Sequence, residues 1–261
     1  MERILVLNGL ESCGFRFVKS FQGKYDIKFL EPLELKRFLH DLTMLDDVYD
    51  VVINNMEIGF FNTRNYDYMN DINVRLNEYI STRFKKAKII LMSSQFVYKS
   101  SEALKDEDYT TQPETEYGKT KLEAEKIIKK HDSYIIIRRG FSYGKCTMNL
   151  YMDIINALRS HTPIKLNSNV YINPVLNSDL ADITEMLIDD DNDIYNVAGD
   201  EYMTLYDMGN IICNYLKESC NFIKISYIKN LNYAISSERI KKKYNYKFFN
   251  ISDDDILIMQ R

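Results

Sequence analysis

The chain has 261 residues, is 45% apolar and carries a formal net charge of −4 at pH 7. This size and apolar content suffice for one large α/β domain with its own core and a small appendage. The acidic balance argues against nucleic-acid or membrane-surface binding, because only the run ERIKKKYNYK near the C-terminus is strongly basic. No apolar stretch approaches the length of a membrane span, and MERILVLNGLESCGF does not resemble a signal peptide. We therefore expect a cytoplasmic protein.

Six short apolar runs alternate with helix-period segments along the chain. The runs are RILVLN (3–8), YDIKFL (25–30), YDVVIN (49–54), AKIILMSS (87–94), SYIIIR (133–138) and DIYNVAG (193–199). Two of the helical segments between them are NDINVRLNEYISTRFKK and TKLEAEKIIKKH. This alternation is typical of βαβ units, so the sequence predicts an α/β fold with a Rossmann-like, doubly wound parallel sheet.

The first run leads into NGLESCGF, where a dinucleotide-binding fold places its glycine turn. Gly9 and Gly14 fit that turn and Ser12 can cap the following helix, but Glu11 places a negative charge where a phosphate would lie. The stretch alone fits either an eroded nucleotide loop or a plain strand-to-helix turn. Glu31 ends the second run about twenty residues after Gly9, close to the position of a carboxylate that binds an adenosine ribose.

The spacing of the runs also predicts the domain organisation. The roughly 35 residues from Gly14 to Tyr49 are too few for two complete βα units. The alternation breaks at about 145 and again after about 200. We predict a dinucleotide-binding domain over 1–144 and about 170–199, with a smaller substrate-binding lobe built from about 145–170 and 200–261.

A tyrosine and a lysine stand four apart at the start of the segment TEYGKTKLEAEK. Of the 20 tyrosines, only Tyr117 has a lysine, Lys121, at this spacing. Positions i and i+4 share one helix face, but the pair alone also fits an ordinary solvated helix. Upstream, MSSQFVYKSS places Ser93 and Ser94 at the carboxyl end of a predicted parallel strand, where open α/β sheets bind ligands.

Taken together, SSQFVY, EYGKTKLEAE and RRGFSYG resemble the extended short-chain dehydrogenase/reductase family. Within it the chain is most similar to the dTDP-4-dehydrorhamnose reductase group. The likeness continues through YDVVINN, DINVRLNEY, INPVLNSDLAD, IYNVAG and YAISSERIKKKYNYK, and so covers nearly the whole chain.

The resemblance implies NADPH- or NADH-dependent reduction of a 4-keto-6-deoxy nucleotide-diphosphate sugar. Tyr117 would donate the proton, Lys121 would lower the tyrosine pKa and contact the nicotinamide ribose, and Ser94 would polarise the carbonyl. The cofactor-binding residues would be Gly9, Ser12, Gly14, Glu31, Asn54, Tyr117, Lys121 and Gly140. Asn73 is expected to hold backbone or water behind the site, and Ser93 to cap its own backbone.

Other functions and assemblies remain open at this point. Some relatives that epimerise and reduce carry a cysteine where this chain has Gln95, and a neutral amide cannot exchange a proton beside a ketone, which favours simple reduction. An NAD-dependent nucleotide-sugar 4-epimerase would use the same three catalytic residues. A catalytically inactive regulatory or binding relative would explain the eroded glycine loop. The resemblance also implies a possible homodimer.

No metal site is expected from the sequence. The four cysteines lack C-x-x-C spacing, and the three histidines are not spaced as ligands. The cysteines, Cys13, Cys146, Cys213 and Cys220, are therefore expected to be reduced thiols.

Overall fold

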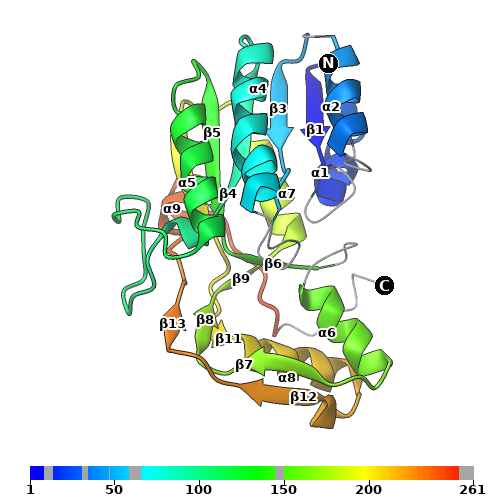
Figure 1. The fold of residues 1–261 in the computed structure, drawn as a ribbon, viewed down its shortest axis with the longest axis vertical. Coiled ribbons are helices and arrows are strands. Elements are labelled where there is room, and N and C mark those ends of the chain that lie inside the picture. Colours follow the sequence, from blue (N-terminus) through cyan, green and yellow to red (C-terminus); the bar gives the residue numbers. More distant parts are fainter. Residues whose placement is uncertain (9–13, 31–34, 47, 59–65, 145–149, 253–261) are drawn as a thin grey trace.

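A six-stranded parallel sheet forms the centre of the molecule (Figure 1). The structure, a computed structural model, describes residues 1–8, 14–30, 35–46, 48–58, 66–144 and 150–252. The strands are β1 (Arg3–Leu7), β2 (Asp26–Leu30), β3 (Val51–Asn54), β4 (Lys88–Ser94), β5 (Tyr134–Arg139) and β10 (Asp193–Val197). Each predicted apolar run forms one of them, which confirms the Rossmann-like fold. Strands covered on both faces need continuous apolar sequence, so such runs are a direct signal of a parallel sheet.

The strand order is β2-β1-β3-β4-β5-β10, so the chain crosses from one side of β1 to the other between β2 and β3. A single strand, β2, lies on the far side of β1. This agrees with the prediction that the segment before Tyr49 is too short for two βα units. In open α/β sheets, ligands bind beside the carboxyl ends of the strands at such a reversal, here the ends of β1 and β3.

Helices cover both faces of the sheet. Successive residues of a strand point to opposite faces, so Ile4 and Val6 enter one core while Leu5 and Leu7 enter the other. The first face is covered by α1 (Gly14–Phe21), α7 (Asn177–Met186) and α9 (Glu238–Tyr244). The second face is covered by α2 (Leu35–Met44), α3 (Tyr66–Asn70), the π-helical turn η1 (Asp71–Arg75), α4 (Leu76–Arg83) and α5 (Glu116–Ile128).

A smaller unit lies beyond the carboxyl ends of the sheet, at the bottom of Figure 1, and has its own apolar core. Its elements are α6 (Leu150–Arg159), β7 (Ile164–Asn167), β8 (Val170–Ile172), β11 (Met203–Thr204), α8 (Leu205–Leu216), η3 (Cys220–Phe222), β12 (Ile223–Ser226) and β13 (Leu231–Asn232). The strands β6 (Phe141–Tyr143) and β9 (Pro174–Leu176) pair with each other between the two units. The division into domains stays a prediction, and α9, from residues assigned to the lobe, packs on β10.

Two cysteines of the smaller unit form a disulfide, so the expectation of reduced thiols is wrong for this pair. Cys213 lies in the last turn of α8, and Cys220 begins η3. Lys217 adopts a left-handed conformation that ends the helix and turns the chain back, which brings the two Cα atoms to 5.7 Å. Spacing alone did not reveal this pairing because it depends on where the helix ends.

None of the helices within the described ranges is long and apolar enough to cross a bilayer.

Candidate functional site

Helix α5 positions Tyr117 and Lys121 against the carboxyl end of β4. The helix begins after Thr115, whose hydroxyl accepts a hydrogen bond from the Gly118 backbone N–H at 3.0 Å. Gly118 lets the helix approach the turn after β4, because a Cβ there would lie 2.1 Å from the carbonyl oxygen of Phe96. The first turn of α5 is therefore held tightly at the edge where parallel sheets bind ligands.

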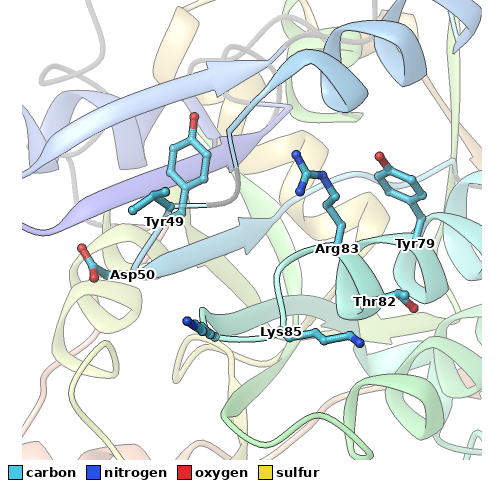
Figure 2. A pocket seen from close by; sticks show the side chains of 8 residues that line it. Tyr49, Asp50, Tyr79, Thr82, Arg83 and Lys85 are labelled. Carbon is cyan, nitrogen blue, oxygen red and sulfur yellow. The ribbon is translucent and has the colours of Figure 1, made fainter.

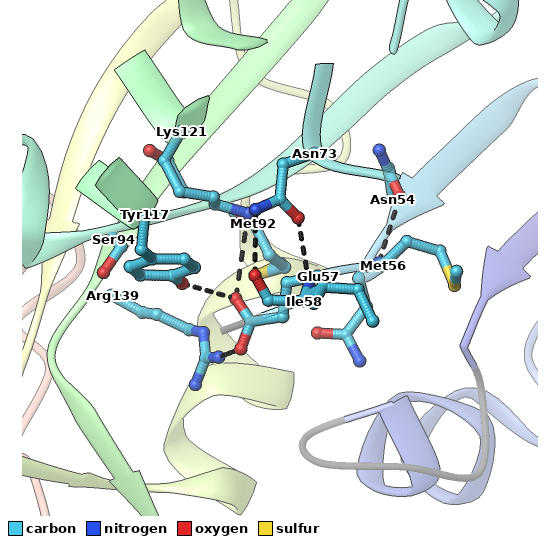
Figure 3. Close-up of polar contacts among 12 residues, drawn as sticks. Asn54, Met56, Glu57, Ile58, Asn73, Met92, Ser94, Tyr117, Lys121 and Arg139 are labelled. Carbon is cyan, nitrogen blue, oxygen red and sulfur yellow. Dashed lines mark hydrogen bonds and ion pairs between the residues drawn. The ribbon is translucent and has the colours of Figure 1, made fainter. Parts of the chain in front are cut away.

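The side chains of Tyr117 and Lys121 converge on one carboxylate (Figure 3). Tyr117 donates its phenolic hydrogen to Glu57 Oε2 at 2.8 Å, and Lys121 Nζ lies 3.7 Å from the same oxygen. Lys121 is buried and also donates to the carbonyl oxygen of Met92 in β4. The structure thus brings the predicted pair together, around an acidic residue that the sequence analysis did not single out.

Glu57 follows β3, and its second oxygen forms an ion pair with Arg139 at the carboxyl end of β5. Arg139 also donates to Ser142 Oγ at 2.6 Å. Glu57 follows β3, and Arg139 is the last residue of β5. Their positions at the carboxyl ends of parallel strands were the sequence signal that could have identified them. Without the fold, nothing in the sequence indicates that residues 57, 117 and 139 meet.

The surroundings set the protonation of the two central groups. Burial raises the pKa of Tyr117 well above its ordinary value, and the negative charge of Glu57 raises it further, although Arg139 and a hydrogen bond with Ser94 act in the opposite direction. Burial alone would also raise the pKa of Glu57, but the charges of Arg139 and Lys121 and the bond from Tyr117 outweigh it and lower that pKa. The expectation of a depressed tyrosine pKa is therefore wrong for this arrangement.

Three polar residues follow one another at the end of β4. Ser94 Oγ accepts a hydrogen bond from the Phe96 N–H at 3.3 Å. Ser93 donates to Glu125 Oε1 at 2.6 Å, so the expectation that it caps its own backbone is wrong: its side chain faces α5. Gln95 is only 1% exposed, and neither polar atom of its amide has a hydrogen-bond partner among the described residues. A buried amide without partners can take up a polar ligand.

Two asparagines shape the backbone near Glu57. Asn73 donates to the carbonyl oxygen of Ile58 at 3.0 Å and accepts from its N–H at 2.9 Å, which confirms the expected role of holding backbone behind the site. Asn54 donates to Asn77 Oδ1 at 2.8 Å and accepts from the Met56 N–H at 3.0 Å. In this structure Asn54 therefore stabilises the turn after β3, and its predicted contact with a cofactor stays a prediction.

The predicted glycine loop is only partly described. Gly9, Ser12 and Glu31 lie outside the described residues, and Gly14 is the first residue of α1. Gly140, at the end of β5, is closely packed, because a Cβ there would lie 2.7 Å from the Asn173 carbonyl oxygen and 2.8 Å from Ala198 Cβ. This packing explains the glycine, and the cofactor contacts of these positions stay predictions.

A pocket of about 700 Å³ lies at the other end of the sheet, where β3 begins (Figure 2). It is lined by Val48, Tyr49, Asp50, Tyr79, Thr82, Arg83, Lys85 and Lys86. None of the predicted site residues lines it, and it lies at the amino end of β3 rather than at the carboxyl ends where Ser94 and Glu57 lie. We therefore do not assign it to the chemistry of Tyr117. Across the described part of the chain, no three histidine, cysteine or acidic side chains gather as a metal site would require.

The fold and this site define a class of protein. A parallel sheet with the β1/β3 reversal, a strand-end serine and a Tyr-Lys pair on the next helix characterise the extended short-chain dehydrogenases/reductases, which are oxidoreductases. A family model described as "RmlD substrate binding domain" matches residues 63–242. The chain belongs to this family. A search of curated proteins found no significant match.

Solved structures of related enzymes share the fold over almost their full length. The dTDP-4-dehydrorhamnose reductase of Bacillus anthracis, solved with NADP, has a TM-score of 0.88 at 16% identity, covering 99% of each chain. Its counterpart from Clostridium acetobutylicum gives 0.82 at 18% identity, covering 98% of this chain and 99% of the other. The UDP-glucose 4-epimerase of Thermus thermophilus, solved with NAD, has a TM-score of 0.83 at 11% identity, covering 99% of this chain and 98% of the other.

Proposed function

We propose that this chain is an NADPH- or NADH-dependent reductase of a 4-keto-6-deoxy nucleotide-diphosphate sugar. The observation that carries the proposal is the convergence of the Tyr117 phenol and the Lys121 ammonium on one point beside Ser94. Relatives of the same fold are a dTDP-4-dehydrorhamnose reductase with NADP and a 4-epimerase with NAD. Family membership supports the nucleotide-sugar class of substrate.

The described residues fit a bound nicotinamide cofactor, which supplies the hydride when present. Lys121 can donate to ribose hydroxyls, and the unpartnered amide of Gln95 offers a buried donor and acceptor for a polar ligand. Tyr117 gives its proton to the oxygen that gains negative charge as the ketone is reduced. Ser94 donates a hydrogen bond to the same oxygen and so stabilises that charge.

Gln95 supports simple reduction over reactions that also move a proton on carbon. Such reactions need a titratable group beside the ketone, and an amide does not titrate near neutral pH. A 4-epimerase remains the second candidate, because it would use the same three catalytic residues. It would retain its cofactor through purification, whereas a reductase releases the oxidised cofactor after each turnover.

The test is turnover of NADPH or NADH by the purified protein with a 4-keto-6-deoxy nucleotide sugar. Tyr117→Phe removes the acid and keeps the ring, so we expect turnover to fall by at least ~10²-fold with little change in cofactor affinity. Lys121→Ala should reduce both turnover and cofactor affinity. The matched control is Tyr227→Phe, because Tyr227 is 73% exposed in the smaller unit. Undiminished turnover by Tyr117→Phe would contradict the assignment of Tyr117.

Failure of the wild-type chain to bind either nicotinamide cofactor at millimolar concentration would contradict the proposed reductase. It would favour the inactive binding relative, and the eroded loop at 9–14 would then be the reason.

A further inference from the structure

The surroundings of the Tyr117 hydroxyl contain one negative and two positive charges. Glu57 approaches from the segment after β3, Lys121 from α5 and Arg139 from the end of β5. Ser94 faces it from β4, and the rings of Phe96 and Tyr117 pack in a T-shaped arrangement, with 6.0 Å between centroids. Glu57 is hydrogen-bonded directly to the phenol.

We propose that Glu57 is a positioning residue that keeps Tyr117 protonated, in the form that can donate a proton to a ketone oxygen. The reaction assumed here is that of the proposed function. The electrostatic effect of Glu57 follows from the described geometry alone. Ionising Tyr117 would place a second negative charge 2.8 Å from Glu57 Oε2 and would remove the hydrogen that now joins them. Both effects oppose the phenolate.

Without Glu57, the balance of charge would reverse. Arg139 already lowers the pKa of Tyr117, and without Glu57 its charge and that of Lys121 would no longer be opposed by this carboxylate, which favours the phenolate. The carboxylate is well placed to persist, because Arg139 pairs with one of its oxygens while Lys121 lies near the other. The raised pKa of Tyr117 and the lowered pKa of Glu57 agree with this arrangement.

Protonation of Tyr117 decides whether it can act as the acid in reduction. In reduction, the phenol proton passes to the oxygen of the new hydroxyl group, and the remaining phenolate regains a proton from solvent. A Tyr117 held as the phenolate would have no proton to donate to that oxygen. For reduction, the O–H of Tyr117 must turn from Glu57 to the ketone oxygen, while Arg139 still holds the carboxylate.

The inference is tested by titrating Tyr117 directly, with no substrate or cofactor. The protein is labelled with ¹³C at tyrosine Cζ, and the signal missing from Tyr117→Phe is assigned to Tyr117. In the wild type we expect this signal to stay at the phenol position up to about pH 10. In Glu57→Gln it should move to the phenolate position at a pH at least ~1 lower. Glu123→Gln is the matched control, because Glu123 is an exposed carboxylate on α5, the helix that carries Tyr117. It should leave the titration of Tyr117 unchanged.

Several results would overturn the inference. A wild-type Tyr117 that ionises at or below about pH 10 is one, and needs no variant. An unchanged titration in Glu57→Gln, or in Glu57→Ala should Glu57→Gln not fold, is another. In the reductase assay, the loss of turnover at high pH should begin at lower pH in Glu57→Gln, which a merely structural role would not cause.

The two proposals fail separately. If Tyr117 ionises at lower pH in Glu57→Gln but the wild type reduces no nucleotide-sugar ketone, the role of Glu57 is supported and the proposed function is contradicted. If turnover requires Tyr117 but the titration of Tyr117 is unchanged in Glu57→Gln, the proposed function is supported and the role of Glu57 is contradicted.

Discussion

Arg138 and Glu125 form a double ion pair between β5 and α5, with Nε donating to Oε1 at 2.9 Å and Nη2 to Oε2 at 2.7 Å. Their side chains are 3% and 0% exposed. Ser93 bonds the carboxylate, and Tyr98 accepts a hydrogen bond from the guanidinium at 2.8 Å. The pair connects the strand end that carries Arg139 to the helix that carries Tyr117, so it stabilises the site from behind.

Removing one partner of this pair should be costly. Arg138→Met leaves the Glu125 carboxylate buried with little compensation, so we expect a loss of about 3–5 kcal/mol in the free energy of unfolding. Urea denaturation measures it. Lys126→Ala is the control, because Lys126 and Glu123 form an exposed pair on the same helix and should contribute little. A loss no larger than that of the control would contradict the structural role of the pair.

Gly118→Ala should destabilise the protein although alanine normally favours a helix. The added Cβ would meet the Phe96 carbonyl oxygen at 2.1 Å, and backbone cannot move away cheaply. We expect a cost of about 1–3 kcal/mol in place of the usual gain. Gly209→Ala in α8 is the comparison, because its Cβ would meet side chains rather than backbone: the flexible tip of Leu166 at 2.3 Å and Ile223 at 3.4 Å. If thermal unfolding shows that Gly118→Ala destabilises the protein less than Gly209→Ala, the described close contact between α5 and the turn after β4 is contradicted.

Asp179 should make stability depend on pH near neutrality. It accepts bonds from the Tyr246 hydroxyl and the Phe249 N–H, both at 3.0 Å, and so ties the C-terminal segment to α7. Burial, with a smaller contribution from Asp182, raises the pKa of Asp179 to about 7, although these two bonds act in the opposite direction.

The sign follows from proton binding. Between the unfolded pKa near ~3.9 and the folded value, only the folded chain binds the proton, so this stabilisation is complete at low pH and lost as pH rises through about 7. From about pH 8 to pH 6 the wild type should gain on the order of 1 kcal/mol more than Asp179→Asn. Urea titrations of both proteins measure the difference. Equal pH dependence would show that Asp179 does not titrate in this range.

The outer face of α4 and α5 is where we predict a homodimer. The two helices contact each other on one face of the sheet (Figure 1). A hollow of about 280 Å³ between them is lined by Glu78, Ser81, Thr82, Ile127, Lys130 and His131. These mostly polar residues predict an interface with a polar rim.

Sedimentation velocity at micromolar concentration should show a dimer. Thr82→Arg should weaken it by placing a long charged side chain in the interface, and Thr162→Arg, on an exposed turn of the smaller unit, should not. A wild-type monomer would contradict the prediction.

The sequence by itself determined the sheet and the central pair of the site. Six apolar runs became the six strands because a parallel strand is buried on both faces and tolerates few polar residues. Helix geometry places Tyr117 and Lys121 on one face, and the resemblance of EYGKTKLEAE to the reductase family marked them as a catalytic pair. Ser94 was found because parallel strands end at one edge of the sheet. Each of these signals is local, and local geometry can be read from spacing.

The tertiary structure alone decided what surrounds that pair. Glu57 lies 60 residues before Tyr117 and 82 before Arg139. These three side chains meet because β3 and β5 end, and α5 begins, at the same edge of the sheet. The partner of Ser93, the disulfide of Cys213 with Cys220 and the direction of the Tyr117 pKa likewise depend on packing. A pKa is set by burial and by charges within a few ångströms, and no spacing along the chain contains those distances.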